Sequence, residues 1–227
     1  MNVLCGEIAQ MMDHSLLRPE LTEDDIKKGC EIAKKYQVAS VCCSPFSVSL
    51  VKKYLEGSSV KVTTVVGFPF GYSKTETKIF ETEQAIDDGA VEVDMVLNIS
   101  KLKSLDFEYV KNDIKEVVDA AHKRNVLVKV ILENYYLTDE LKKKACTICD
   151  EVGADWVKTS TGFAAGGATL EDLHLMRKAV SDKVQIKAAG GIRDLDMAVQ
   201  VKEAGCSRFG ATATVQILKK CYEKYGK

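Results

Sequence analysis

Short runs of β-branched and apolar residues alternate along the chain with longer segments in which apolar residues recur every three or four positions. The short runs are typical of buried strands, and the longer segments are typical of amphipathic helices. This pattern predicts strands at residues 11–15, 39–43, 60–66, 91–96, 126–132, 155–158, 184–187 and 208–210. Strands that alternate with helices indicate a parallel sheet built from βα units.

Helix boundaries support the same division. The segment 106–121 has apolar residues at steps of three or four, and Thr169 and Asp172 have the spacing of a capping box, which predicts a helix starting there. Gly89, Gly153 and Gly205 each lie between a predicted helix and the next strand, where a left-handed glycine is expected. No proline-rich linker divides the chain. The pattern therefore predicts a single-domain α/β protein, a TIM (β/α)8 barrel over residues 1–227.

Strand parity predicts an unusual barrel interior. Side chains alternate between the two faces of a strand. If Lys158 and Lys187 point inward, so do the residues of the same parity on other strands: Cys42, Lys61, Thr63, Glu92, Asp94 and Lys129. The opposite parity is apolar, as at Val91, Val93, Val128, Val130, Val157 and Ile186, and suits packing against helices. Barrel interiors are usually apolar, so four lysines facing Glu92, Asp94 and Asp13 need an explanation.

Lys158 and Lys187 end two consecutive strands, and each is followed by a glycine-bearing turn. Burial disfavours an ammonium, and adjacent strands lie about 4.8 Å apart, so the charge of one lysine would favour the neutral, nucleophilic form of the other. Asp94 can transfer a proton. Because barrel active sites form at carboxyl strand ends, we prefer catalysis over internal ion pairing, which remains the alternative for Glu92. The pattern favours a carbon–carbon lyase, without fixing which lysine is the nucleophile.

Glycine-bearing turns cluster after the last three predicted strands, at Gly162, Gly166–Gly167, Gly190–Gly191 and Gly210. Helices are expected to follow near Thr169, Asp194 and Thr212. Free backbone N–H groups at helix starts favour anions, and barrels often bind phosphate after strands seven and eight. These turns therefore predict a phosphorylated small-molecule substrate.

Composition narrows the class of partner. The 227 residues are 46% hydrophobic and 29% charged, as in soluble globular proteins, and the net charge is −1. This balance gives no indication of nucleic acid or a membrane surface as partner. No apolar run approaches the roughly 18 residues of a membrane span, and no signal peptide is evident, so we expect a cytoplasmic protein.

The eight cysteines are interpreted as reduced thiols, because no secretion signal accompanies them. Cys146 and Cys149 form a C-x-x-C within a helical pattern. Two thiols on a buried helix face explain it better than a redox or zinc site, since a second ligand pair is missing from the sequence. The three histidines are too few and too dispersed for a histidine metal site.

Several motifs carry a family resemblance. "MDHSLLRP", "EVDMVLNIS", "VKVILENYYLTDE", "VKTSTGF" and "KAAGGIR" resemble deoxyribose-phosphate aldolase, and "SVCCSPF" and "TTVVGFPFG" fit as well. The resemblance runs from about residue 8 to residue 215. It implies a class I aldolase, without metal or cofactor, that interconverts 2-deoxy-D-ribose 5-phosphate with acetaldehyde and D-glyceraldehyde 3-phosphate. A homodimer is the family-level expectation.

The resemblance also implies roles for residues. Lys158 would form the Schiff base, Lys187 would perturb it and relay protons, and Asp94 would donate and accept protons. The implied substrate-binding residues are Asp13, Ser15, Cys42, Lys129, Thr159, Gly162, Gly190, Gly191, Gly210 and Thr212. A packed small side chain is an alternative role for Cys42.

The chain departs from the family pattern at three places. Ser15 stands where the family usually has threonine, and "GATAT" replaces consecutive serines after the last strand. The family often ends in a tail with a catalytic tyrosine, whereas this chain ends "KYGK", and we leave Tyr225 out of the site. The alternatives are a Schiff-base barrel aldolase for another sugar phosphate and a non-catalytic phosphosugar-binding barrel.

Overall fold

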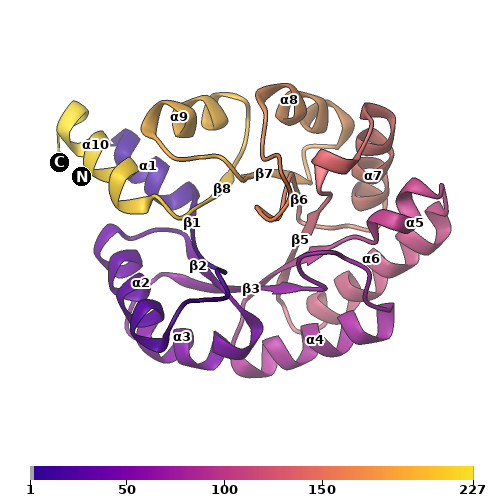
Figure 1. The fold of residues 1–227 in the computed structure, drawn as a ribbon, viewed down its shortest axis with the longest axis horizontal. Helices are drawn as coiled ribbons and strands as arrows, with labels where there is room; N and C mark the ends of the chain where they lie inside the picture. Colours follow the sequence, from indigo (N-terminus) through magenta and orange to yellow (C-terminus); the bar gives the residue numbers. More distant parts are fainter. Residues whose placement is uncertain (1–2, 227) are drawn as a thin grey trace.

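The fold is a closed ring of parallel strands surrounded by helices (Figure 1). The structure, a computed structural model, describes residues 3–226. Its strands pair in chain order, and the last pairs with the first. They are β1 Met12–Leu16, β2 Ser40–Cys43, β3 Lys61–Val66, β4 Glu92–Val96, β5 Leu127–Ile131, β6 Trp156–Lys158, β7 Gln185–Ala189 and β8 Arg208–Ala211. The predicted (β/α)8 barrel is confirmed, and every strand lies within two residues of its predicted ends.

The helices cover the outside of the barrel. They are α1 Val3–Met11, α2 Glu23–Tyr36, α3 Val48–Leu55, α4 Thr75–Asp88, α5 Ile99–Lys103, α6 Phe107–His122, α7 Asp139–Glu151, α8 Leu170–Ala179, α9 Leu195–Glu203 and α10 Thr214–Tyr225, with short 3-10 turns at Pro45–Ser47 and Asn134–Tyr136. The Thr169 side chain caps α8 by accepting from the Asp172 N–H, which confirms the predicted helix start, while the Asp172 carboxylate binds Lys142 at 2.6 Å instead of completing the capping box. Gly89, Gly153 and Gly205 have φ values of 109°, 76° and 87°, as helix-ending glycines were expected to have.

The main apolar core lies between strands and helices. The outward-facing residues Val93, Val128, Val130, Val157 and Ile186 are fully buried there. Each such side chain contributes about 1.5–3 kcal/mol when it leaves water. Val91 is the exception, at 44% exposed, because it precedes β4. This arrangement leaves the inside of the barrel for polar side chains. No helix in the described part of the chain is long and apolar enough to cross a membrane.

The first and last helices lie side by side on the outside of the barrel. Figure 1 shows α1, which the sequence pattern did not predict, beside α10. Cys5 of α1 and Cys221 of α10 are buried and form a disulfide with a Cα–Cα distance of 5.8 Å. The prediction that all cysteines are reduced thiols is therefore wrong for this pair. Barrel closure brings together residues 216 positions apart, which no local pattern reveals.

The remaining cysteines are free thiols in buried positions. Cys146 and Cys149 lie on the buried face of α7, as the helix-face interpretation predicted. Burial raises the pKa of the Cys146 thiol to about 12, so this group stays protonated at neutral pH.

Candidate active site

The barrel interior is polar, as strand parity predicted. The strand register places Asp94 beside Lys129 and Lys158 beside Lys187. These four side chains are at most 4% exposed. Lys61 shares their parity, but it is the first residue of β3 and therefore lies at the amino ends of the strands, where its side chain is 47% exposed. Its ammonium still reaches Glu92, at 3.1 Å.

Asp94 is the centre of the cluster. Its Oδ2 atom accepts from the Lys158 and Lys187 ammonium groups, each at 2.7 Å. Its other oxygen, Oδ1, accepts from Lys129 at 3.0 Å. The structure thus brings together the three predicted catalytic residues, and the two lysines share one carboxylate oxygen.

A second tier of ion pairs lies next to Asp94. Lys187 also pairs with Asp13 at 2.5 Å, and Asp13 pairs in turn with Arg208. Glu92 binds Lys129 at 2.6 Å and Arg208 at 2.7 Å. Sequence reasoning missed Arg208, although it has the inward parity of Gly210 on β8, and that signal was available.

Lys158 has fewer anionic contacts than the other buried cations of this cluster. Lys129, Lys187 and Arg208 each pair with two carboxylates, whereas Lys158 pairs only with Asp94 in the part of the chain that the structure describes. Three buried carboxylates, those of Asp13, Glu92 and Asp94, thus face four buried cations, and Lys158 has the fewest carboxylate partners of the four. A buried amine without a carboxylate of its own is the one expected to lose its proton.

The pKa values follow these contacts. Burial lowers the pKa of Lys158, and the Lys187 charge lowers it further, although Asp94 opposes both. Burial acts on Lys187 and Lys129 as well, but their two carboxylate partners outweigh it and raise both pKa values. Burial favours protonation of Asp94, yet the three lysines hold its pKa well below the usual range. Of the three lysines around Asp94, Lys158 is therefore the only one whose pKa is lowered, and it is the candidate to lose its proton.

A cavity of about 660 Å³ opens above the lysines at the carboxyl ends of the strands. Eight of the ten predicted substrate-binding residues line it: Asp13, Ser15, Cys42, Gly162, Gly190, Gly191, Gly210 and Thr212. Lys129 and Thr159 are fully buried and do not line the cavity. The Thr159 hydroxyl donates to the Ala189 carbonyl at 3.1 Å and accepts from the Ala189 N–H at 3.0 Å, so it joins the ends of β6 and β7.

Of the turns that were predicted to bind an anion, Gly162, Gly190–Gly191 and Gly210 line this cavity, whereas Gly166 and Gly167 do not. Gly190 has a φ of +81°, and a Cβ atom there would lie 2.9 Å from the Gly167 Cα, so the turns after β6 and β7 touch because neither carries a side chain. Helix α10 begins at Thr214, after the N-cap Ala213, whose methyl group cannot cap it. Arg18 and Arg193, which sequence reasoning did not select, add positive side chains to the lining. This end of the cavity suits an anion.

Cys42 lies at the inner end of the cavity and is 2% exposed. Burial and the Asp94 charge raise the pKa of its thiol to about 11. The group is therefore a neutral thiol near pH 7 and supplies shape rather than a nucleophile.

Tyr225 lies at the far end of α10. The helix begins just after the carboxyl end of β8 and runs back along the barrel for 12 residues, which is about 18 Å. This placement is consistent with leaving Tyr225 out of the site.

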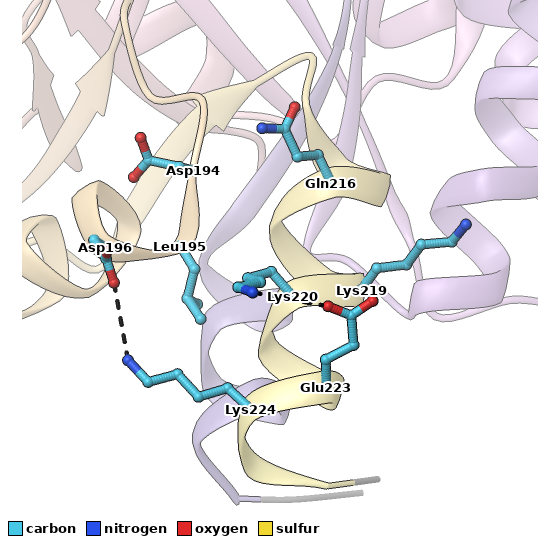
Figure 2. A pocket seen from close by; sticks show the side chains of 8 residues that line it. All are labelled: Asp194, Leu195, Asp196, Gln216, Lys219, Lys220, Glu223 and Lys224. Carbon is cyan, nitrogen blue, oxygen red and sulfur yellow. Dashed lines mark ion pairs between the residues drawn. The ribbon is translucent and has the colours of Figure 1, made fainter.

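A second hollow, of about 760 Å³, lies between the start of α9 and the outer face of α10 (Figure 2). Its charged side chains form long, exposed ion pairs, such as Lys224 with Asp196 and Lys220 with Glu223, each at 4.0 Å. Exposed pairs of this kind are typical of a solvated surface. The strand-end cavity, which contains the buried lysines, is therefore the candidate active site.

The fold and the cavity define an enzyme-like (β/α)8 barrel with a buried lysine pair beneath a cavity lined by glycine turns and two arginines. The family model described as DeoC/LacD family aldolase matches residues 7–223. The chain belongs to this family of aldolases.

Individual relatives agree with the family. The deoxyribose-phosphate aldolase of Thermococcus kodakarensis is 51% identical over 215 residues, which are 94% of this chain and 96% of the relative. The deoxyribose-phosphate aldolase of Clostridium tetani is 52% identical over 213 residues, which are 94% of this chain and 98% of the relative. A solved structure, the tetrameric deoxyribose phosphate aldolase from Aeropyrum pernix, matches with a TM-score of 0.90 at 28% identity, over 97% of this chain and 93% of that chain.

Proposed function

We propose that this chain is a deoxyribose-phosphate aldolase, which cleaves 2-deoxy-D-ribose 5-phosphate to acetaldehyde and D-glyceraldehyde 3-phosphate and also catalyses the reverse reaction. The observation that carries the proposal is the single Asp94 oxygen shared by Lys158 and Lys187 beneath a cavity with an anion-binding wall. The names of relatives about 50% identical to the chain supply the substrate. The reaction belongs to the breakdown of deoxyribonucleotides.

Lys158 is the nucleophile in this proposal. Its neutral amine adds to the aldehyde carbon of the open-chain sugar phosphate, and the carbinolamine loses water to give a protonated imine. Loss of the proton from the C3 hydroxyl then breaks the C2–C3 bond, and the electron pair moves into the imine to form an enamine. Glyceraldehyde 3-phosphate leaves, the enamine takes up a proton at carbon, and water releases acetaldehyde and Lys158.

Asp94 and Lys187 move protons in these steps. Asp94 already contacts both amines at 2.7 Å, so it can pass a proton between the Lys158 nitrogen and Lys187 without a large movement. Before the reaction Lys187 is charged because Asp13 and Asp94 hold it, and this charge opposes protonation of Lys158; during the reaction Lys187 can donate its proton through Asp94 and take it back. Lys129 neutralises the second oxygen of Asp94 from below.

The cavity lining holds the substrate. Gly190, Gly191, Gly210 and Thr212 take the phosphate, with Arg193 at the edge of the cavity. Asp13, Ser15 and Gly162 surround the sugar, and Cys42 shapes the inner end. Lys129 and Thr159 do not contact the substrate in this proposal. Lys129 acts through its ion pair with Asp94, and Thr159 holds the end of β7 through its bond to the Ala189 carbonyl.

We propose further that the whole chain is one aldolase domain, that it functions in the cytoplasm and that it forms a homodimer. The Aeropyrum pernix enzyme is a tetramer, which supports self-association of the family in general. Sedimentation of the purified protein would distinguish a dimer from a monomer or a tetramer.

The test of the proposed reaction is a cleavage assay. The protein is mixed with 2-deoxyribose 5-phosphate, and glyceraldehyde 3-phosphate is measured with a coupled dehydrogenase. We expect turnover, and a lower KM for the 5-phosphate than for free deoxyribose. Equal activity on both sugars would contradict the phosphate-binding assignment, and no cleavage of either would contradict the proposed reaction.

A further inference from the structure

Glu133 occupies an unusual position directly behind the candidate active site. It follows β5 and is 2% exposed. Its φ of 54° and ψ of 64° lie in the left-handed region, which residues other than glycine rarely adopt. Such a conformation costs about 1–3 kcal/mol and persists only when surrounding contacts hold it. A buried carboxyl group on a strained backbone therefore needs strong partners.

The partner of Glu133 is Thr161, in the turn that follows β6. Both carboxylate oxygens accept from the Thr161 N–H at 3.3 Å, and one also accepts from the Thr161 hydroxyl. The hydroxyl oxygen in turn accepts from the Phe163 N–H at 3.0 Å. This chain of hydrogen bonds encloses Gly162, whose φ is +87°. One buried side chain thus holds the whole turn.

The turn matters because it follows Lys158 and forms part of the cavity. Thr161, Gly162 and Phe163 line the cavity, whereas Glu133 lies behind them. Up to Thr159 the main chain is held by backbone bonds, from the Leu132 N–H to the Lys158 carbonyl and from the Asn134 N–H to the Thr159 carbonyl, both at 2.9 Å. Beyond Thr159, the Glu133 carboxylate holds the segment that follows β6 against the segment that follows β5, through its hydrogen bonds to Thr161.

We infer that Glu133 is a positioning residue, which fixes the Thr161–Phe163 turn as a wall of the substrate cavity through the Thr161 side chain. The inference rests on the proposed function for its kinetic consequence, but the attachment itself does not depend on it. Glu133 acts through Thr161 because Thr161 lies between it and the cavity.

Two pairs of variants separate the attachment from the charge. Glu133→Ala and Thr161→Val each remove the hydrogen bond between the two side chains. Glu133→Gln keeps an acceptor without the charge, and Thr161→Ser keeps the hydroxyl. Glu116→Ala, on the exposed face of α6, is the matched control for loss of a carboxylate. Circular dichroism and the melting temperature would establish that each variant is folded before the comparison.

The first readout needs no substrate. Amide hydrogen exchange, followed by mass spectrometry, reports the opening of the peptide that contains Thr161 and Phe163. We expect exchange of this peptide to become about tenfold faster in Glu133→Ala and Thr161→Val, the change that corresponds to loss of about one hydrogen bond, with the other strands unchanged. Unchanged exchange would overturn the inference, whether or not the protein cleaves deoxyribose 5-phosphate.

The second readout is the split between KM and kcat. In Glu133→Ala we expect KM for the 5-phosphate to rise about tenfold and kcat to fall less than about threefold, because the wall is disturbed while Asp94 and Lys158 stay in place. Glu133→Gln should restore KM to within about threefold of the original value. An equal defect in Gln and Ala would mean that the charge matters and would overturn a positioning role, as would a normal KM in Glu133→Ala. If the original protein itself shows no cleavage, the proposed function fails and the exchange experiment alone decides the inference.

Discussion

Two buried lysines in different layers of this barrel show how the proposed nucleophile differs from a structural amine. Lys158 lies inside the barrel and Lys78 lies in the helical layer, on α4, and burial lowers the pKa of both. Lys78 pairs with Asp113 of α6 at 2.6 Å and donates to the Val96 carbonyl at 2.9 Å. It is fully buried.

Lys158 differs from Lys78 in its access and in its partner. Lys158 lines the substrate cavity, whereas Lys78 does not. Lys158 also shares the Asp94 oxygen with Lys187, whereas Asp113 pairs with Lys78 and accepts a further bond from the neutral Thr75 hydroxyl at 2.8 Å. A depressed pKa alone therefore does not identify a catalytic lysine. The shared carboxylate and the open cavity together are what support the proposed catalytic role of Lys158.

Replacing Lys158 should have the largest effect on activity. In Lys158→Met, kcat for deoxyribose 5-phosphate should fall by on the order of 10⁴-fold or more, because no amine remains to form the imine. The fold should remain, since Asp94 keeps Lys129 and Lys187 as partners. A steady-state assay with circular dichroism as the folding control checks this. Retained turnover in a folded Lys158→Met protein would assign the nucleophile elsewhere.

Replacing Lys187 should have a smaller, pH-dependent effect. Lys187→Leu removes a cation that lowers the pKa of Lys158 and leaves Asp94 Oδ2 to Lys158 alone, so both changes raise that pKa. Each unit of increase reduces the neutral amine about tenfold near pH 7, so we expect a loss of roughly 100-fold or more there. Part of it should return as the pH rises and Lys158 deprotonates. A loss that is the same at every pH would indicate that Lys187 acts in proton relay alone.

Replacing Lys78 should affect stability rather than chemistry. Lys78→Met leaves the Asp113 carboxylate buried without its cation, which typically costs about 3–5 kcal/mol. The folded fraction should keep kcat within about threefold, since Lys78 does not line the cavity. Chemical denaturation measures the free energy of unfolding. The double variant Lys78→Met with Asp113→Leu should recover most of the loss, and a large fall in kcat would contradict the structural role.

The smallest effect is expected at Ala213. This N-cap of α10 has no side-chain hydrogen bond to the helix, and a serine would supply a hydroxyl next to Thr212, which lines the proposed phosphate end of the cavity. We expect Ala213→Ser to lower KM for the 5-phosphate by less than about tenfold, with kcat unchanged, and to stabilise the protein by about 1 kcal/mol through capping. Kinetics with deoxyribose as the control substrate check the first effect. An equal change for both sugars would mean that the hydroxyl does not contact phosphate.

The sequence could predict the barrel and the centre of its site because both depend on local regularity. Alternating side chains placed Glu92, Asp94 and Lys129 inside, and the strand ends placed Lys158 and Lys187 together. Neighbouring parallel strands then brought these groups within contact distance. Arg208 had the same signal, on a strand of only four residues.

Other features depend on the closed fold and left no local pattern. Glu133 meets Thr161 across 28 positions, after its strand has ended, where parity no longer applies. Cys5 and Cys221 meet only because the first and last helices pack together once β8 pairs with β1. Family motifs predicted Thr159 and Lys129 as substrate-binding residues, but neither lines the cavity. Strand parity predicts which side chains face the barrel interior, but it does not predict how deep below the cavity floor each one lies.

The most direct test of the central claim is to trap the imine. The protein is incubated with acetaldehyde, reduced with borohydride and digested, and the two-carbon addition is located by peptide mass. The account predicts the addition on Lys158, with none on Lys78 and with loss of the adduct in Lys158→Met. An adduct on Lys187 or Lys129, or no adduct in the original protein, would contradict it.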